Sequence, residues 1–383
     1  MSKRNKKKFH NKRKRGQSIA AQKRELAYRN PEFVKGISFG EPFVPIKRPR
    51  GKSMKEIILY LIINSGEIPT DLDELMNITK GTFRSYISNL YEENLARLNT
   101  KDKVHTYLLS THAKYALKEH RPFICTSNDI TSRKRHIRLA RLNAFFWGLG
   151  VSVFRHQNPS AENIAYNDGA QRQFRFYNCF YIKPAVTEYT ENIKRSRSFG
   201  LLTGFCKNYM VYYEPKGIDF YFEEELLRMN ISKYIGTEVK EMLMVLDSYH
   251  HAALWLQFLF NHNDYFYGDM PSRFFKKVKI LIMDKNAHDA LLVLREEEIF
   301  EERIKHYCRL DDSYYLLLSL DVYKLYSLVW RSNENLQDTI NIVTAPYLME
   351  IVTAMTKNTG INVYTLPNEA WEKHCEIIRS CFQ

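Results

Sequence analysis

Three aspartates in the second half of the chain each follow a short, mainly apolar segment, and carboxylates in this arrangement could hold a metal ion. They are Asp247, Asp284 and Asp321. In open α/β sheets, ligands bind outside the carboxyl ends of the strands, and Mg²⁺ prefers oxygen ligands. One hypothesis is therefore a Mg²⁺-dependent nuclease that uses Asp247 with Asp284 or Asp321. The alternative is structural, because aspartate is a good N-cap and each of the three precedes a predicted helix.

Two sequence patterns of nucleases match only in part. In a ribonuclease H-like order of strands and helices, Glu223 to Glu225 and Asp247 would supply two metal ligands. The first strand of that order, Ser198 to Phe205, carries no acid, so the metal pair is not formed. The segment Glu238-Val239-Lys240 follows Asp219 as in restriction nucleases, but so short a pattern occurs by chance in a charged chain. We assign no catalytic residue, which favours a protein that is not an enzyme.

The remaining metal-binding residue types do not form a recognisable site. His250 and His251 are adjacent on a predicted helix and point about a quarter turn or more apart, so they do not easily face one ion. The six cysteines are scattered without a CxxC pair, which is typical of reduced, packed cysteines in a cytoplasmic protein. We find no P-loop, no GxGxxG segment and no nucleophile elbow. The sequence therefore predicts neither a metal nor a cofactor.

A second set of residues, nearer the N-terminus, has side chains that reach the phosphates and base edges of DNA. On the outward face of a predicted helix these are Lys80, Arg84, Ser85, Ser88 and Asn89. Lys101 and Lys103 stand at the tip of a predicted hairpin that follows this helix. A helix-turn-helix presents such residues on its recognition helix. The pattern predicts binding of duplex DNA in the major groove, with the hairpin tip on the neighbouring backbone.

The elements that position these residues lie between Met54 and Leu109 and have the pattern of a winged helix. An apolar run, Ile57 to Ile62, predicts the first helix, and Thr70 is a candidate N-cap for the second. A third helix follows the turn Asn77-Ile78-Thr79, and two short strands then form the hairpin, or wing. Helices and a hairpin in this order also occur in protein-docking modules, so docking of another protein is the alternative.

A predicted long helix, opened by Ser132, carries four more candidate DNA contacts in its first turns. They are Arg133, Lys134, Arg135 and Arg138. Cations near a helix N-terminus are unfavourable relative to the helix dipole, so we expect a negative partner. Either a nucleic-acid backbone or an acidic surface of the protein's own body would serve. His136 is interpreted as a packed or surface histidine.

The charge is concentrated in the first part of the chain. The net charge is +14, and residues 1–50 alone contain 16 Lys or Arg and three Glu. Residues 51–150 are also basic, which leaves a slightly acidic remainder. A polycationic segment of this kind is expected to be disordered and to bind polyanions without sequence preference. We find no signal peptide and no membrane-spanning run, and therefore expect a cytoplasmic protein with no membrane contact.

These patterns predict four parts and an overall α/β fold. The parts are a disordered basic arm and linker (1–50), a winged-helix domain (51–122), a basic helix and connector (123–170) and an α/β domain (171–383). In the last part, we expect a strand from Phe174 to Ile182 and then an antiparallel meander of strands near 199–205, 209–214 and 218–222. Alternating strands and helices follow, among them a helix from Tyr249 to about Asn261 and a strand from Tyr314 to Leu320. Such alternation predicts a parallel sheet covered on both faces. This domain is expected to mediate self-association or to bind a partner protein.

Several segments resemble a known family. They are the helix-turn-helix from Asp71 to Leu95, the basic segment His136 to Ala140, and Ser196 to Leu202 leading into Tyr209 to Tyr213. In these the chain resembles the replication-relaxation and similar accessory proteins of plasmids and conjugative elements of Gram-positive bacteria. The resemblance implies a DNA-binding protein of a mobile genetic element, acting in replication, transfer or regulation. It transfers no catalytic residue. An RNA-associated or structural role is a third hypothesis.

Overall fold

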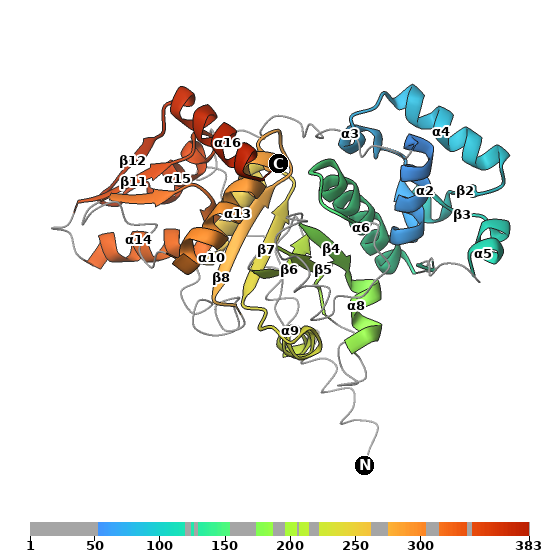
Figure 1. Cartoon of the computed structure of the whole chain (residues 1–383), viewed down its shortest axis with the longest axis horizontal. Helices are drawn as coiled ribbons and strands as arrows, with labels where there is room; N and C mark the ends of the chain where they lie inside the picture. Colours follow the sequence, from blue (N-terminus) through green and yellow to red (C-terminus); the bar gives the residue numbers. More distant parts are fainter. Residues whose placement is uncertain are drawn as a thin grey trace, which may run out of the picture.

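The computed structural model has a mixed α/β fold with three β-sheets in the residues that it describes (Figure 1). These residues are 53–118, 124–125, 129–153, 174–186, 196–204, 207–213, 222–261, 275–303, 314–334 and 339–382. The basic arm and the predicted strand from 218 lie outside this part of the chain, except for Phe222. Within it, no helix has both the length and the apolar character needed to cross a membrane.

Residues 53–118, here the N-terminal unit, combine short helices with a three-stranded antiparallel sheet of order β1-β3-β2. The elements are α2 (Met54–Ser65), β1 (Glu67–Pro69), α3 (Asp73–Met76), α4 (Lys80–Glu92), β2 (Ala96–Asn99), β3 (Thr106–Leu109) and α5 (Thr111–Lys118). The helices and the hairpin lie where the sequence pattern predicts them. Strand β1 was not predicted, and the expected cap at Thr70 is wrong, because α3 begins at Asp73 after Leu72.

Local sequence explains where the two longer helices of this unit begin and end. Ser53 and Glu56 form a capping box at the start of α2, and Gly66, with φ +83°, ends it. The Thr79 hydroxyl accepts a hydrogen bond from the Thr82 amide, 3.1 Å away, at the start of α4. These caps fix the outward face of α4 relative to the sheet.

Helix α6 (Ile130–Gly148) joins the N-terminal unit to the rest of the chain. It begins two residues before the predicted Ser132, because the Asp129 carboxylate accepts a hydrogen bond from the Ser132 amide at 2.8 Å. One side of α6 packs against α2, β1 and α3. Its C-terminal half contacts the large sheet, where the rings of Phe146 and Phe176 lie 4.9 Å apart.

The large sheet has six strands in the order β10-β8-β7-β6-β5-β4. Its strands and flanking helices are β4 (Arg175–Asn178), α8 (Cys179–Val186), β5 (Gly200–Thr203), β6 (Asn208–Tyr213), α9 (Phe222–Ile235), β7 (Glu241–Leu246), α10 (Tyr249–Asn261), β8 (Lys277–Ile282), α13 (Ala287–Arg303) and β10 (Leu320–Asp321). Strands β4, β5 and β6 form an antiparallel meander, and β6, β7 and β8 are parallel. The meander therefore begins with β4, one strand earlier in the chain than the predicted first strand near 199–205. The expected strand from Phe174 to Ile182 ends at Asn178, where α8 follows.

The end of the chain forms a separate parallel sheet of order β12-β11-β9. It contains β9 (Tyr314–Leu317), α14 (Val322–Glu334), β11 (Ile340–Thr344), α15 (Met349–Thr356), β12 (Ile361–Thr365) and α16 (Asn368–Phe382). The expectation of one parallel sheet is therefore wrong. The predicted strand from Tyr314 to Leu320 divides at Leu318 and Ser319, so that β9 pairs with β11 while β10 pairs with β8.

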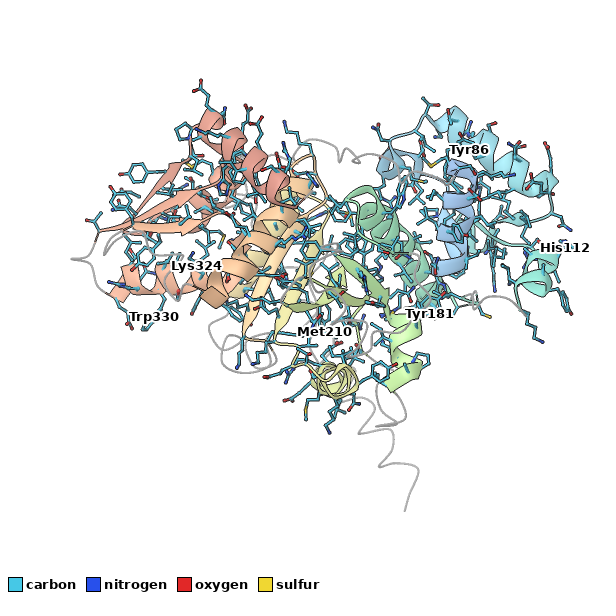
Figure 2. All side chains as sticks on the ribbon, viewed as in Figure 1. Tyr86, His112, Tyr181, Met210, Lys324 and Trp330 are labelled. Carbon is cyan, nitrogen blue, oxygen red and sulfur yellow. The ribbon has the colours of Figure 1, made fainter. Side chains whose placement is uncertain are left out.

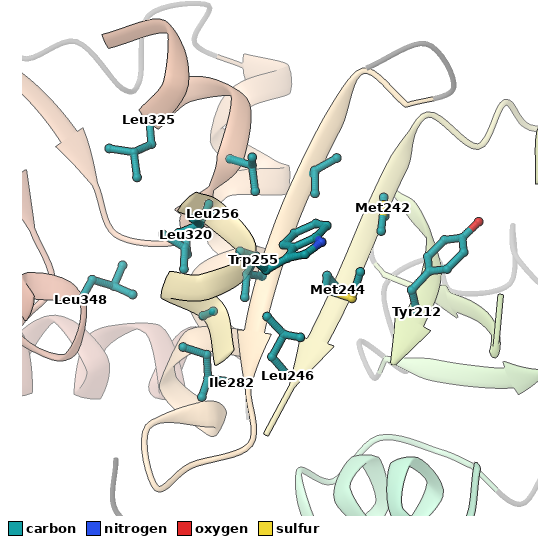
Figure 3. Packing of buried hydrophobic residues seen from close by; sticks show 14 of the residues in the cluster. Tyr212, Met242, Met244, Leu246, Trp255, Leu256, Ile282, Leu320, Leu325 and Leu348 are labelled. Carbon is teal, nitrogen blue, oxygen red and sulfur yellow. The ribbon is translucent and has the colours of Figure 1, made fainter. Parts of the chain in front are cut away.

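Two apolar cores lie on opposite faces of the large sheet, because successive side chains of a strand point to opposite faces. One contains Tyr212, Met244 and the fully buried Trp255 of α10, and continues into the sheet of β9, β11 and β12 (Figure 3). The other contains Tyr213 and Val245, and continues through α6 into α2 and α4. The N-terminal unit and the large sheet therefore share one continuous core.

Candidate nucleic-acid interface

Helix α4 presents a polar and basic face to solvent. Phe83, Ile87 and Leu90 are buried beneath it. The candidate contacts Lys80, Arg84, Ser85, Ser88 and Asn89 are all exposed. Within the described part of the chain, neither Lys80 nor Arg84 forms a hydrogen bond or an ion pair through its side chain. Figure 2 shows side chains projecting outward along α4 around Tyr86. This face is therefore open to solvent.

The loop between β2 and β3, here the hairpin tip, is a single turn of 3-10 helix from Lys101 to Lys103. Both lysine side chains are exposed. Lys103 has φ +59°, a left-handed conformation that is uncommon for a residue other than glycine. The hairpin tip therefore has the predicted exposed cations, on a backbone of unusual conformation.

The prediction that Arg133, near the start of α6, contacts DNA is wrong. Its side chain is fully buried, and its guanidinium donates to the Glu67 carboxylate and to the backbone carbonyls of Lys101 and Val104. A residue with no exposed surface cannot contact a phosphate. The negative partner expected for this cation is thus an acid of the protein itself, Glu67, whose side chain is equally buried.

Arg135 is also held by the protein. Its guanidinium donates to the Ser198 carbonyl at 2.6 Å and lies over the Phe199 ring at 4.8 Å. It therefore packs against the start of β5, but the residue is only half-buried, so the phosphate contact expected at Arg135 stays a prediction. Lys134 is exposed, and Arg138 is half-buried with its Nε 3.4 Å from the Lys134 carbonyl. Of the four candidates on α6, Lys134, Arg135 and Arg138 retain surface that a ligand could reach.

A buried polar junction connects α2 to the large sheet. The carbonyl of Asn64 accepts from the Asn178 amide at 3.3 Å, and its side-chain oxygen accepts from the Tyr181 hydroxyl at 3.1 Å. Ser65 accepts from the Asn143 amide at 2.9 Å, and its carbonyl lies 2.7 Å from the His136 ring. Tyr181 marks this junction in Figure 2. The sequence indicated only a helix end here, because the partners are distant in the chain.

His136 is a packed histidine, as one of the two interpretations had it. It is buried, and its ring is tilted against Phe180 at 4.9 Å. Burial lowers the pKa of this imidazole below its ordinary value, although the hydrogen bond with the Ser65 carbonyl acts in the opposite direction. The neutral form is therefore favoured in the folded protein.

No protein-family model matches the chain, and no characterised protein and no solved structure is significantly similar to it.

The three aspartates of the nuclease hypothesis each interact with a different part of the protein. Asp247 is exposed and accepts from the Tyr213 hydroxyl at 2.5 Å. Asp284 accepts from the Tyr249 hydroxyl at 2.7 Å, and Asp321 pairs with Lys279 at 2.9 Å. Among the described residues, no group of three His, Cys, Asp or Glu could hold a metal ion. Their arrangement gives no support to a three-carboxylate Mg²⁺ site.

The alternative interpretation as N-caps holds for only one of the three. The Asp321 carboxylate accepts from the Lys324 amide at 3.0 Å and so caps α14. At the start of α10 the cap is Ser248, whose hydroxyl accepts from the His251 amide at 3.2 Å, and not Asp247. Asp284 accepts from the Asn286 amide at 3.0 Å, one residue before α13 begins.

Of the acids in the ribonuclease H-like pattern, Glu224 does not lie with Asp247, and the side chain of Glu223 is outside the described residues. Glu224 is buried and accepts from the Tyr212 hydroxyl at 2.8 Å, whereas Asp247 is bound to Tyr213. Tyr212 and Tyr213 are neighbours on β6 and point to opposite faces of the sheet, so the two acids cannot share a metal ion. In the restriction-nuclease pattern, Glu238 pairs with Lys240 at 2.6 Å and Asp219 lies outside the described residues.

Proposed function

We propose that the chain is a DNA-binding protein whose N-terminal unit is a winged helix that binds duplex DNA. The order α2-β1-α3-α4-β2-β3 with an antiparallel sheet supports this assignment. In such a domain α4 is the recognition helix and the β2–β3 hairpin is the wing. The observation that carries the proposal is the outward face of α4, where exposed cations, hydroxyls and an amide lie side by side.

Two kinds of contact are assigned to this surface. Lys80 and Arg84 bind phosphates or guanine edges, and Ser85, Ser88 and Asn89 are placed for hydrogen bonds to bases or backbone. Lys101 and Lys103 bind the neighbouring phosphates, and the basic arm adds salt-dependent affinity without sequence preference. Given the resemblance to replication-relaxation proteins, the DNA is proposed to belong to a mobile genetic element.

The test replaces Lys80 and Arg84 by Gln in the full chain and measures duplex binding by fluorescence anisotropy between 50 and 200 mM salt. Each lost phosphate contact lowers the slope of log K against log salt by about 0.9, so we expect a reduction of about 1.8. The control is the double variant Lys357→Gln/Lys373→Gln, which removes the same charge from exposed positions near the C-terminus.

Equal slopes for the two double variants would show that α4 does not contact the duplex. The same titration is run with single-stranded DNA and structured RNA, and the products with Mg²⁺ are separated on a gel. A preference for RNA would indicate that the basic arm, and not α4, binds the nucleic acid. Cleavage abolished by Asp247→Asn would support the nuclease hypothesis instead.

A further inference from the structure

Arg133 lies beneath the hairpin tip and connects it to α6. Its Nη1 donates to the Lys101 carbonyl at 2.6 Å, and its Nη2 donates to the Val104 carbonyl at 3.1 Å. These two carbonyls bracket the turn that carries both lysines. Because guanidinium donors have a fixed planar geometry, one side chain can hold both ends of the turn at a set separation.

The Arg133 guanidinium is in turn paired with the carboxylate of Glu67 in β1. Arg133 Nε lies 3.2 Å from Glu67 Oε2, and both side chains are fully buried. The Thr106 hydroxyl donates to the same oxygen at 2.6 Å. This chain of contacts runs from β1 through α6 to the hairpin tip and includes β3. A buried charge that is paired and hydrogen-bonded in this way holds its position, because any displacement leaves a charge unpaired in the interior.

Other hydrogen bonds among the described residues also act within the hairpin tip. The Val104 amide donates to the Lys101 carbonyl at 3.2 Å, and the Lys101 amide donates to the Asn99 side chain at 3.2 Å. Lys103 is in the left-handed region, which costs a residue with a Cβ about 1–2 kcal/mol. The hydrogen bonds from Arg133 to both ends of the turn offset part of this cost.

We propose that Arg133 is a positioning residue that holds Lys101 and Lys103 in place for contact with DNA, an inference that rests on the proposed function of the same surface. The role differs from a phosphate contact, because the guanidinium never reaches the ligand. It makes α6 a part of the DNA-binding unit. The partner of this surface is the phosphate backbone of a duplex, next to the site occupied by α4.

The first experiment needs no DNA. Arg133→Gln and Lys134→Gln remove one positive charge each from adjacent positions, but only Arg133 is buried. By hydrogen exchange, we expect the amides of residues 100–106 to exchange on the order of tenfold faster in Arg133→Gln, beyond any change in α4, which reports the general loss of stability caused by the unpaired Glu67. Lys134→Gln should exchange like the wild type. Arg133→Lys keeps the charge beside Glu67 without the planar fork, so we expect an intermediate effect from a variant that still folds.

The second experiment separates positioning from general loss of stability. In the wild type, Lys101→Gln/Lys103→Gln should lower the salt slope of duplex binding by about 1.8. In an Arg133→Lys background the same pair should lower it clearly less, because the lysines are already misplaced. Additive effects, or wild-type exchange at residues 100–106 in both Arg133 variants, would overturn the inference. If the wild type binds no duplex, the proposed function fails, while the exchange result still decides whether Arg133 holds the hairpin tip.

Discussion

Lys279 of β8 is the centre of a buried ionic network whose removal gives a sharp test of the structure. Its ammonium lies 2.7 Å from Glu297 and 2.9 Å from Asp321, and it donates to the Ser319 hydroxyl at 3.1 Å. The exposed fractions of the Lys279, Glu297 and Asp321 side chains are 4%, 7% and 7%. One cation thus compensates two acids between β8, α13 and β10.

Replacing Lys279 by Met leaves two buried carboxylates without their cation. Removing one partner of a buried pair typically costs about 3–5 kcal/mol, and we expect a loss of this size in the free energy of unfolding. The control is Lys240→Met, which breaks the pair with Glu238. These side chains are 42% and 53% exposed, so we expect little or no loss there. Urea unfolding followed by tryptophan fluorescence measures both, since Trp255 packs against the same sheet (Figure 3).

The stability lost on removing Lys279 should depend on pH through the ionisation of Asp321. Burial alone favours protonated Asp321, but Lys279 and the Lys324 amide together hold its pKa below the ordinary value. In the wild type this carboxylate therefore stabilises the fold above pH 4, and the contribution is lost as the pH falls through the lowered pKa. When Lys279 is removed, Asp321 is still buried but has lost its cation. Its pKa therefore rises, and the protonated form becomes favourable in the folded state. The loss caused by Lys279→Met should then be larger at pH 8 than at pH 5, and a loss below about 1 kcal/mol at both values would refute the buried network.

Two further predictions concern the junction between α2 and the large sheet. Because burial lowers the pKa of His136, the unfolded chain binds its proton first as the pH falls below about 6.5, so stability should fall between pH 6.5 and 5. Thermal unfolding should show a smaller loss over this range in His136→Gln, and an unchanged loss would contradict this. Asn64→Ala removes the acceptor of the Tyr181 hydroxyl and should cost about 1–3 kcal/mol in urea unfolding, against at most about 0.5 for the exposed Asn89→Ala. Equal losses in these two variants would argue against a stabilising junction.

The sequence predicts elements best where local signals agree with the final packing. The bounds of α10, Tyr249 to Asn261, match the prediction, because a long apolar run is preceded by a capping serine. Likewise α4 follows a threonine cap and alternates buried and exposed positions at helical spacing. The outward positions of its candidate residues followed directly from that periodicity. Local sequence was sufficient there because, among the described residues, no distant segment covers the exposed face.

The sequence-based predictions are wrong where a residue or strand pairs with a segment that is distant in the chain. A run of cations at 133–135 indicates a basic surface, yet Arg133 pairs with Glu67, 66 residues earlier in the chain. No local pattern distinguishes this arginine from the exposed Lys134 beside it. The division of residues 314–320 between two sheets has the same origin, because β10 is defined by its pairing with β8. Apolar content predicts burial, whereas strand pairing and ion pairing depend on which segments meet.

Helix α6 belongs physically to both the N-terminal unit and the large sheet, and this bears on how DNA binding would affect the rest of the protein. Its buried face contributes His136 and Asn143 to the junction with Ser65, and Phe146 to the core beneath β4. A fragment ending near residue 122 would lack Arg133 and would expose the apolar surface that α6 covers on α2. Because the N-terminal unit and the large sheet share one core, the large sheet has a fixed orientation relative to α4. A duplex bound at α4 would therefore set the direction in which the α/β body, and any protein that it contacts, projects from the DNA.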